Sequence, residues 1–323
     1  GYGYAFKRLV TAAEQADVWA VRRAGLGLMM NVPGSARPLP FVEDTAVTPA
    51  ALPEYVRRFD QLIREHGTVA GYYGHASVGC LHIRPLIDLK EREGVERMVS
   101  IATAVSDLVL EFGGAVSGEH GDGLVRSVWN EKMFGPSVYE GFRRVKAAFD
   151  PAGTMNPGKI VDSPPMTENL RIDPTYRTLE LKTGFSYVQQ GGHAGAIEAC
   201  NGQGACLKVA GGTMCPSYMA TRDEEHSTRG RANALRAAIS GALPVDALTS
   251  DRLRDVMDLC LECKACKTEC PSNVDMAKLK YEFLDRYHKA NGYPIRNRLL
   301  ANIASLSRLG SLFAPVSNWT LRS

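Results

Sequence analysis

The sequence lacks the features that mark a membrane protein or a nucleic-acid-binding protein. It contains no stretch of about 18 apolar residues, the length needed to cross a bilayer. No block of Lys or Arg occurs, because the 38 basic and 35 acidic residues are interspersed and give a net charge of +3. We therefore expect no transmembrane segment and no nucleic-acid partner.

Two further absences concern the start of the chain and its cysteines. No secretory leader is visible, and the chain opens at Gly1 rather than at methionine, so we expect a fragment of a longer protein. Before residue 200 only Cys80 is present, whereas seven cysteines lie between Cys200 and Cys270. Such clustering indicates metal or iron–sulfur ligation in a reducing compartment, not a secreted disulfide framework. We expect a cytoplasmic protein in which Cys80 is a small buried residue.

The first half of the chain combines helical and strand-like patterns. At 323 residues, with 45% apolar and 23% charged residues, the chain is long enough for two globular domains. Helical spacing occurs at 7–31, 53–67, 95–112 and 138–149, and strand-like runs occur at 41–47, 69–75 and 80–85. The last two runs flank a small-residue turn, which is a hairpin signal. We predict an α+β domain over residues 1–162, an antiparallel sheet with helices on one side.

The second half reads as helical throughout. Residues 163–190 are rich in proline and poor in periodic apolar positions, which indicates a linker. We predict an all-α domain over residues 191–290, with helices at 232–239, 253–259 and 276–287. The tail at 291–323 is amphipathic without a strongly basic face, so we interpret it as a connector to a missing domain.

The most specific motif is a run of four cysteines. Cys260, Cys263, Cys266 and Cys270 followed by Pro271 have the bacterial ferredoxin spacing, in which three thiolates bind one cluster and the fourth binds the other cluster. Zinc is the structural alternative, but zinc sites usually pair two Cys-x2-Cys knuckles. By the same cross-ligation, Cys215 of a Cys-Pro pair would complete a 4Fe-4S cluster with Cys260, Cys263 and Cys266.

Three thiolates then remain for a second cluster. Cys200, Cys206 and Cys270 suit either a 3Fe-4S cluster or a 4Fe-4S cluster with one ligand other than cysteine, because Gln203 stands where the ferredoxin spacing places a thiolate. In the alternative, Cys200 and Cys206 are structural and the domain holds a single cluster.

The segment Ser117–Gly123 has glycine at three of its seven positions, which indicates a shaped site rather than a plain surface turn. It carries Glu119 and His120 side by side. His75 and His82 are seven residues apart and would face opposite sides of one unbroken strand, so the intervening turn has to redirect His75. With Glu119, the two histidines form a set suited to zinc or manganese. Taken singly, each histidine is more simply interpreted as a satisfied core or turn residue.

Charged neighbours extend this candidate site. Arg84 lies two residues beyond His82 on the same strand face, where it could pair with a substrate carboxylate; the alternative is a salt-bridged or exposed arginine. Arg22 and Arg23 are expected to close the first helix, where a positive charge is favourable by default. A bent backbone at the glycines would let Glu119 face a metal while His120 faces the substrate.

Three segments together resemble a known family. The segments 73–82, 118–123 and 149–159 resemble the C-terminal cap domain of the FAD-linked D-2-hydroxyacid dehydrogenases, flavoproteins of the vanillyl-alcohol-oxidase type. The second half resembles the α-helical ferredoxin module, with further matches at 215–218 and 227–231. The combination is similar to long bacterial fusion proteins, from which the N-terminal FAD-binding domain and the C-terminal cysteine-rich domain would be missing here.

The resemblance implies a flavin-dependent oxidation of a D-2-hydroxyacid, D-lactate or D-2-hydroxyglutarate, to the 2-oxoacid. Electrons would pass from FAD to the iron–sulfur clusters and on to an external acceptor, such as a quinone reached through the missing domain. The roles that the resemblance implies are divalent-metal ligands at His75, His82 and Glu119, the base at His120, a carboxylate ligand at Arg22, and flavin neighbours at Asn156 and Gly121. A homo-oligomer and a peripheral position at the inner face of the membrane are compatible with it.

Two departures from the family leave details open. Cys80 stands where many relatives have asparagine, and no clear counterpart of a lysine used by dicarboxylate-specific members occurs near residues 37–44, so the length of the substrate is undefined. The alternative function is an iron–sulfur electron-transfer subunit whose first half is a docking domain without catalytic activity.

Overall fold

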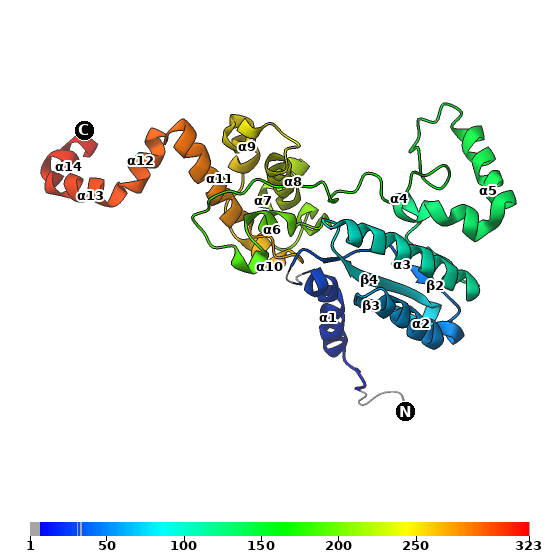
Figure 1. Ribbon diagram of the computed structural model, residues 1–323. Coiled ribbons are helices and arrows are strands. Elements are labelled where there is room, and N and C mark those ends of the chain that lie inside the picture. The colour runs from blue at the N-terminus through cyan, green and yellow to red at the C-terminus, as the bar shows by residue number, and fades with distance from the viewer. Residues whose placement is uncertain (1–6, 31, 33, 323) are drawn as a thin grey trace. The chain divides into compact units, whose positions relative to one another are not determined.

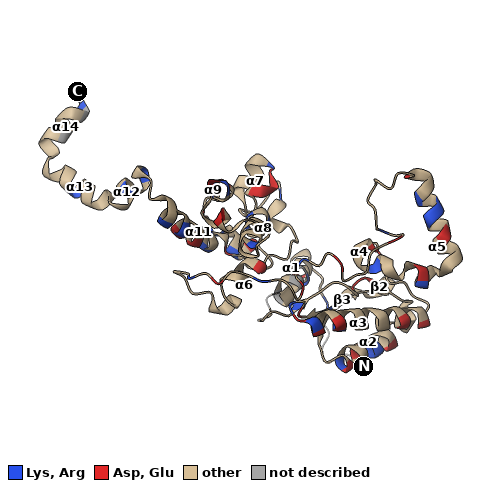
Figure 2. Cartoon of the chain, turned by 45° about the horizontal axis from the view of Figure 1, so that its top comes forward, with Lys and Arg blue, Asp and Glu red and all other residues tan. Residues whose placement is uncertain are grey.

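The computed structural model describes residues 7–30, 32 and 34–322 (Figure 1). The chain divides into two compact units. The first extends to residue 177 and includes 189–191, and the second comprises 178–188 and the chain from 192 onward. Figure 2 shows basic and acidic residues mixed along the helices, as the small net charge leads one to expect. None of the described helices combines the length and apolarity needed to span a membrane.

The first unit is built on a small antiparallel sheet whose central strand is β4. The strands are β1 (Arg37–Pro38), β2 (Thr45–Ala46), β3 (Ala70–His75) and β4 (Cys80–Ile87). Each of the other three pairs with β4 in antiparallel fashion. The predicted hairpin is present, with a 3-10 turn between β3 and β4 that ends at Gly79 in the left-handed region at φ 70°. The predicted α+β class with an antiparallel sheet is confirmed.

Two helices supply the core of this unit. Helices α2 (Leu52–Glu65) and α3 (Arg92–Glu111) match the predicted segments and pack together with the sheet (Figure 1). Their buried side chains form one cluster with those of β4: Tyr55, Phe59, Ile63, Ile83, Ile87, Met98, Ile101, Val105 and Val109. Burial of each such side chain contributes about 1.5–3 kcal/mol, so this cluster is the main source of rigidity behind β4.

The predicted strand at 41–47 is wrong over most of its length. Only Thr45–Ala46 pairs with β4, with Thr45 opposite Leu81. Asp44 has a φ of 79°, a left-handed conformation that interrupts an extended strand. Its buried carboxylate accepts hydrogen bonds from Ser117, Glu119 and His120, so long-range contacts hold the chain in a turn here.

Helix α1 (Ala12–Met30) lies within the segment predicted to be helical. Arg22 and Arg23 are in its interior rather than at its end, which corrects the expectation that they close the helix. The apolar side chains of Val18, Trp19 and Val21 on this helix are exposed. Favourable charge at a helix terminus therefore does not explain Arg22.

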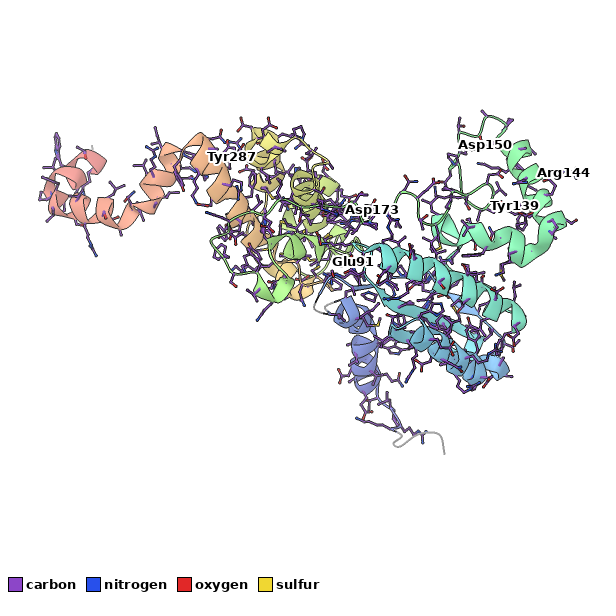
Figure 3. All side chains as sticks on the ribbon, viewed as in Figure 1. Glu91, Tyr139, Arg144, Asp150, Asp173 and Tyr287 are labelled. Carbon is purple, nitrogen blue, oxygen red and sulfur yellow. The ribbon has the colours of Figure 1, made fainter. Side chains whose placement is uncertain are left out.

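The end of the first unit contains a kinked helix and a long turn. The short helix α4 (Gly123–Arg126) precedes α5 (Asn130–Phe149), which is interrupted at Gly135, where φ is 77°, before Pro136. Asp150 then accepts from the Lys146 ammonium at 2.6 Å and from two backbone amides of the following turn. The chain returns along α5, because the amide of Asp162 donates to the Tyr139 hydroxyl at 2.9 Å; Tyr139 and Asp150 are labelled in Figure 3.

The second unit is helical, and no strand occurs among its described residues. Its helices are α6 (His193–Glu198), α7 (Pro216–Thr221), α8 (Thr228–Ile239), α9 (Asp251–Asp258), α10 (Ala265–Glu269), α11 (Met276–Asn291), α12 (Ile295–Ala301), α13 (Ile303–Leu312) and α14 (Ala314–Arg322). The three predicted central helices correspond to α8, α9 and α11. Ile197, Leu235, Ile239, Met257 and Phe283 pack in its core together with the buried cysteines. The three C-terminal helices keep their large apolar side chains mostly exposed.

Candidate functional site

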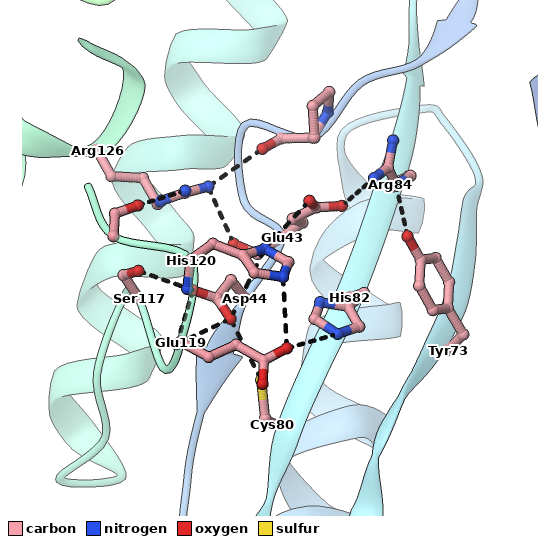
Figure 4. Close-up of polar contacts among 12 residues, drawn as sticks. Glu43, Asp44, Tyr73, Cys80, His82, Arg84, Ser117, Glu119, His120 and Arg126 are labelled. Atoms are coloured by element: carbon pink, nitrogen blue, oxygen red, sulfur yellow. Dashed lines mark hydrogen bonds and ion pairs between the residues drawn. The ribbon is translucent and has the colours of Figure 1, made fainter. Parts of the chain in front are cut away.

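Side chains from three separate segments meet beside β4 (Figure 4). His82 projects from β4 and His75 from the end of β3, while Glu119 and His120 come from the glycine-rich loop after α3. Antiparallel pairing places His75 opposite Cys80 and Tyr73 opposite His82, so the hairpin brings the two histidines within reach of each other. Their ring centroids are 5.2 Å apart.

The three imidazoles converge on one carboxylate oxygen. Glu119 Oε1 lies 3.5 Å from His75 Nε2, 3.3 Å from His82 Nε2 and 3.4 Å from His120 Nε2. The His82 and His120 rings are stacked, with centroids 4.9 Å apart and planes inclined by 6°. Thus Glu119 and His120 do not point in opposite directions; both side chains turn to the same cluster.

Asp44 holds the loop that carries Glu119 and His120. Its carboxylate is fully buried and accepts from the amides of Glu119 at 3.0 Å and His120 at 2.7 Å, and from the Ser117 hydroxyl at 2.7 Å. Burial alone would raise the pKa of Asp44, but these hydrogen bonds outweigh it and lower the pKa to about 2. Asp44 is therefore a buried anion that fixes the backbone on which two site residues stand.

His75, His82 and Glu119 are the residues that the sequence predicts as ligands of a divalent cation. Donor atoms bound to one cation at about 2.1 Å in tetrahedral geometry lie about 3.4 Å from each other, close to the separations of Glu119 Oε1 from both imidazole nitrogens. His82 is buried, and this burial lowers its pKa and favours the neutral ring that binds metals. Among the described residues, the ligand atoms that all lie within 4.8 Å of one another belong to an overlapping set, Asp44, Cys80, His82 and Glu119, which does not include His75.

The thiol of Cys80 is the weaker ligand candidate in that overlapping set. It donates to Asp44 Oδ1 at 3.3 Å. Burial, followed by the neighbouring Asp44 carboxylate, raises the pKa of Cys80 to about 12. A thiol binds metals as the thiolate, so Cys80 would have to release its proton when it binds a cation.

Arginine side chains surround Tyr73 beside the histidines. Arg84 pairs with Glu43 Oε2 at 2.6 Å and donates to the Tyr73 hydroxyl at 3.0 Å, so it occupies the salt-bridged environment that was the alternative to substrate binding. Arg22 lies with its guanidinium carbon 4.6 Å from the centre of the Tyr73 ring, and that ring is 5.0 Å from His82. Of the two arginines, Arg84 pairs with a carboxylate, whereas Arg22 forms no ion pair with a carboxylate among the described residues.

Four residues of the site had not been singled out from the sequence: Glu43, Asp44, Tyr73 and Arg126. Arg126 donates to the carbonyl oxygens of Gly121 at 2.6 Å and Glu43 at 3.3 Å, which ties the glycine-rich loop to the turn before β2 (Figure 4). The one available signal was two adjacent acids, Glu43 and Asp44, inside an otherwise apolar run.

The residues expected near the flavin lie on open backbone. Gly121 has a φ of 81°, and a Cβ atom placed there would meet no atom within 4 Å. Such a backbone leaves room for a planar ring, so this loop is compatible with a flavin neighbour. Asn156 is exposed at a φ of 51°, and its side chain accepts from Lys159 at 2.7 Å.

In the second unit, one cavity collects four thiols. Cys215, Cys260, Cys263 and Cys266 line it together with Thr228 and Arg231. The backbone amide of Thr228 donates to the Cys215 sulfur at 3.0 Å. Four sulfur donors around one cavity fit a cubane cluster, and amide hydrogen bonds to sulfur are a usual feature of such sites.

Cys200, Cys206 and Cys270 belong to the adjoining core. The amide of Arg229 donates to the Cys206 sulfur at 3.3 Å. A hydrogen bond from Cys215, supported by this amide, lowers the pKa of Cys206, and the same contact raises the pKa of Cys215. The composition of a second cluster stays a prediction.

Comparison with known proteins identifies both parts of the chain. Residues 5–160 match the family of FAD linked oxidases, C-terminal domain, and residues 199–275 match the 4Fe-4S dicluster domain. The chain is 33% identical over 333 residues to D-2-hydroxyglutarate dehydrogenase of Escherichia coli strain K12, covering 90% of this chain and 32% of that protein.

Two other relatives give a similar picture. D-2-hydroxyglutarate dehydrogenase of Pantoea ananatis is 34% identical, with 94% of this chain and 33% of that protein covered. D-lactate dehydrogenase of Archaeoglobus fulgidus is 39% identical over 121 residues, 37% of this chain and 26% of that protein. The chain spans about a third of the length of the two D-2-hydroxyglutarate dehydrogenases.

Proposed function

The chain belongs to the FAD-linked oxidases, with their C-terminal domain joined to a 4Fe-4S dicluster domain, and we propose that it is part of a D-2-hydroxyacid dehydrogenase. The substrate we propose first is D-2-hydroxyglutarate, because relatives with this name match nearly the whole chain. D-lactate is the second choice, since the relative of that name matches a shorter part.

The convergence of three imidazoles on Glu119, beside the cation of Arg22, is the observation that carries this proposal. Oxidation of a 2-hydroxyacid requires a base for the hydroxyl proton and a positive group for the carboxylate. The backbone amide of His120 is held by Asp44, and its imidazole is half-exposed. A substrate can therefore reach the ring, which can accept the hydroxyl proton at a nitrogen. Arg22 supplies the guanidinium for the carboxylate.

The cofactors supply the remaining chemistry when they are bound. FAD would supply a hydride acceptor for the substrate carbon, a divalent cation would supply a positive charge for the substrate oxygens, and the iron–sulfur clusters would supply a route for single electrons to an acceptor. We propose His75, His82 and Glu119 as ligands of the cation, and Gly121 and Asn156 as neighbours of the flavin. Asp44 and Arg126 keep the loop of Glu119 and His120 in place for these roles.

The first test is His120→Ala in the full-length enzyme, with His66→Ala as a matched control. His66 lies at the end of α2, and its ring contacts the Leu62 carbonyl oxygen and the Ser100 hydroxyl outside the site. We expect the His120 variant to retain bound FAD and to lose flavin reduction by D-2-hydroxyglutarate by about 10²-fold or more. Near-normal reduction in this variant would refute the assignment of the base.

The divalent cation has a test of its own. We expect metal analysis to find one zinc or manganese ion per chain beyond the iron, and removal by a chelator to lower turnover reversibly. His75→Ala and His82→Ala should each weaken retention of that ion. Full activity after complete removal would contradict a role for the cation in the reaction.

The two proposed clusters can be counted. We propose that Cys215, Cys260, Cys263 and Cys266 bind one 4Fe-4S cluster, and that Cys200, Cys206 and Cys270 bind the second. Anaerobically purified protein should contain about seven or eight iron atoms per chain. Fewer than about six would leave a single cluster with Cys200 and Cys206 in structural positions.

A further inference from the structure

A fully buried arginine lies against the cavity of the four thiols. Arg231 on α8 is 1% exposed and lines the same cavity as Cys215, Cys260 and Cys266. A guanidinium stays protonated at neutral pH even where burial lowers its pKa, so the interior of this unit contains a permanent positive charge. Buried charges are normally paired with an opposite charge.

No carboxylate forms an ion pair with Arg231 among the residues that the structure describes. Its Nε donates to the Val256 carbonyl oxygen at 2.9 Å, and Nη1 donates to the His226 carbonyl oxygen at 2.6 Å. Both terminal nitrogens also lie 3.2 Å from the Ser217 hydroxyl. These neutral acceptors satisfy the hydrogen-bonding groups of the guanidinium, but they leave its charge without compensation.

A second buried cation nearby differs in this respect. Lys280 on α11 donates to the Cys260 carbonyl oxygen at 2.8 Å and pairs with Glu262 at 3.0 Å. Its charge is therefore offset by a carboxylate on the same loop. Of these two cations, Arg231 is the one whose field acts on the cavity without local cancellation.

The charges that face Arg231 are those of three cysteine sulfurs and, more weakly, that of the Glu225 carboxylate, which forms no ion pair with it. The sulfurs of Cys260, Cys215 and Cys266 are its strongest electrostatic partners, and they become thiolates when they ligate iron. We propose that Arg231 is the buried counter-charge of this cluster site and raises the reduction potential of the cluster. A reduced cluster with its thiolates carries one more negative charge than the oxidised one, and no bond forms or breaks. A fixed positive charge in a low-dielectric interior stabilises the reduced form more.

The inference rests on the assignment of Cys215, Cys260, Cys263 and Cys266 to one 4Fe-4S cluster, and not on the identity of the hydroxyacid. Reduction by dithionite tests it without substrate. The experiment is a redox titration of the full-length protein, followed by low-temperature EPR, together with iron and sulfide analysis. Absence of a 4Fe-4S signal from the unmodified protein would reject the cluster assignment before any variant is compared.

Three variants separate charge from structure. Arg231→Gln removes the charge, Arg231→Lys keeps it, and Arg254→Gln removes a charge from an exposed α9 side chain that pairs with Asp255. We expect Arg231→Gln to lower the reduced-to-oxidised ratio of the cluster about tenfold or more at the original midpoint, a downward shift of about 59 mV or more. Arg231→Lys and Arg254→Gln should remain within about threefold of the unmodified protein, with unchanged iron content.

Other outcomes decide the question as well. An unchanged potential in Arg231→Gln, with full iron content, would overturn the proposal, and so would an equal shift in Arg231→Lys. Loss of iron in both Arg231 variants would show a structural requirement for the guanidinium fork and would also overturn it. If only Arg231→Gln loses iron, the potential of Arg231→Lys decides: a value like that of the unmodified protein supports the counter-charge, and a lowered value rejects it.

Discussion

The carboxylate of Asp44 should determine whether the loop of Glu119 and His120 is ordered. Asp44→Asn keeps the size of the side chain and one acceptor oxygen but removes the charge. The pKa of about 2, compared with the ordinary 3.8, means that the folded protein favours the ionised carboxylate by about 2 kcal/mol. This stabilisation is present above about pH 4 and is lost as the pH falls through about 2. At neutral pH the asparagine variant should lack all of it.

Hydrogen exchange measures this loss where it occurs. The amides of Glu119 and His120 donate directly to Asp44, so a local loss of about 2 kcal/mol should increase their exchange through local opening roughly 30-fold. A peptide covering residues 116–122 reports on these amides, and a peptide from α3 in the same sample serves as the internal control. Asp107→Asn, which removes an exposed carboxylate paired with Lys132, is the matched variant and should leave both peptides unchanged.

Equal exchange of the 116–122 peptide in Asp44→Asn and in the unmodified protein would refute this reasoning. The loop would then be held by other contacts, such as those of Arg126. Increased exchange in the α3 peptide as well would show that the variant loses stability throughout the first unit. That result would differ from the local effect expected here. A positive result should be accompanied by weaker binding of a divalent cation, because Glu119 would lose its fixed position.

Three further predictions concern stability, pH and cysteine chemistry. Gly79→Ala should destabilise the first unit by about 2–4 kcal/mol in urea unfolding, because φ is 70° and the new Cβ would lie 1.8 Å from a carbonyl oxygen. The control Gly113→Ala, where φ is 61° and the new Cβ would meet no atom within 4 Å, should destabilise the unit by about 1 kcal/mol. Burial lowers the pKa of His82, so the unfolded chain takes up its proton first and stability should fall below about pH 6.5; His82→Gln should flatten this slope between pH 5 and 7. Because burial raises the pKa of Cys80 to about 12, its native thiol should resist iodoacetamide. Iron analysis should find all iron retained in Cys80→Ala, whereas Cys263→Ala should lose about four iron atoms.

The helices and the hairpin were predictable because their signals are local. Apolar residues at helical spacing lie on one face of a helix, whatever that face packs against. This local pattern located α2, α3, α8, α9 and α11. The small-residue turn before Cys80 located the hairpin in the same way. The strand predicted at 41–47 failed because the apolar run around Glu43 and Asp44 gives no information on the loop residues that bind the Asp44 carboxylate, which lie more than 70 residues away.

The cysteine spacing and the glycine-rich motif indicated which residues are candidates for the two sites, but not the geometry of those residues. The spacing of Cys260, Cys263 and Cys266 is a local property, because one cluster binds closely spaced ligands. Arg84 shows the limit of this approach. Strand alternation placed it on the face of His82, but only the packing of the Glu43 turn against β4 makes it a salt-bridged residue.

By itself, the sequence determined the two-part organisation, the position of most helices, the hairpin, and the residue types available for binding metals and protons. These properties depend on neighbours within a few turns of the chain. Only the tertiary structure decided that Glu119 meets both histidines of the hairpin, that Asp44 anchors the loop of Glu119, and that Arg231 is enclosed without an ion-paired carboxylate among the described residues. Such contacts join residues far apart in the chain, and they depend on which surfaces pack together and on the exclusion of water from the space between them.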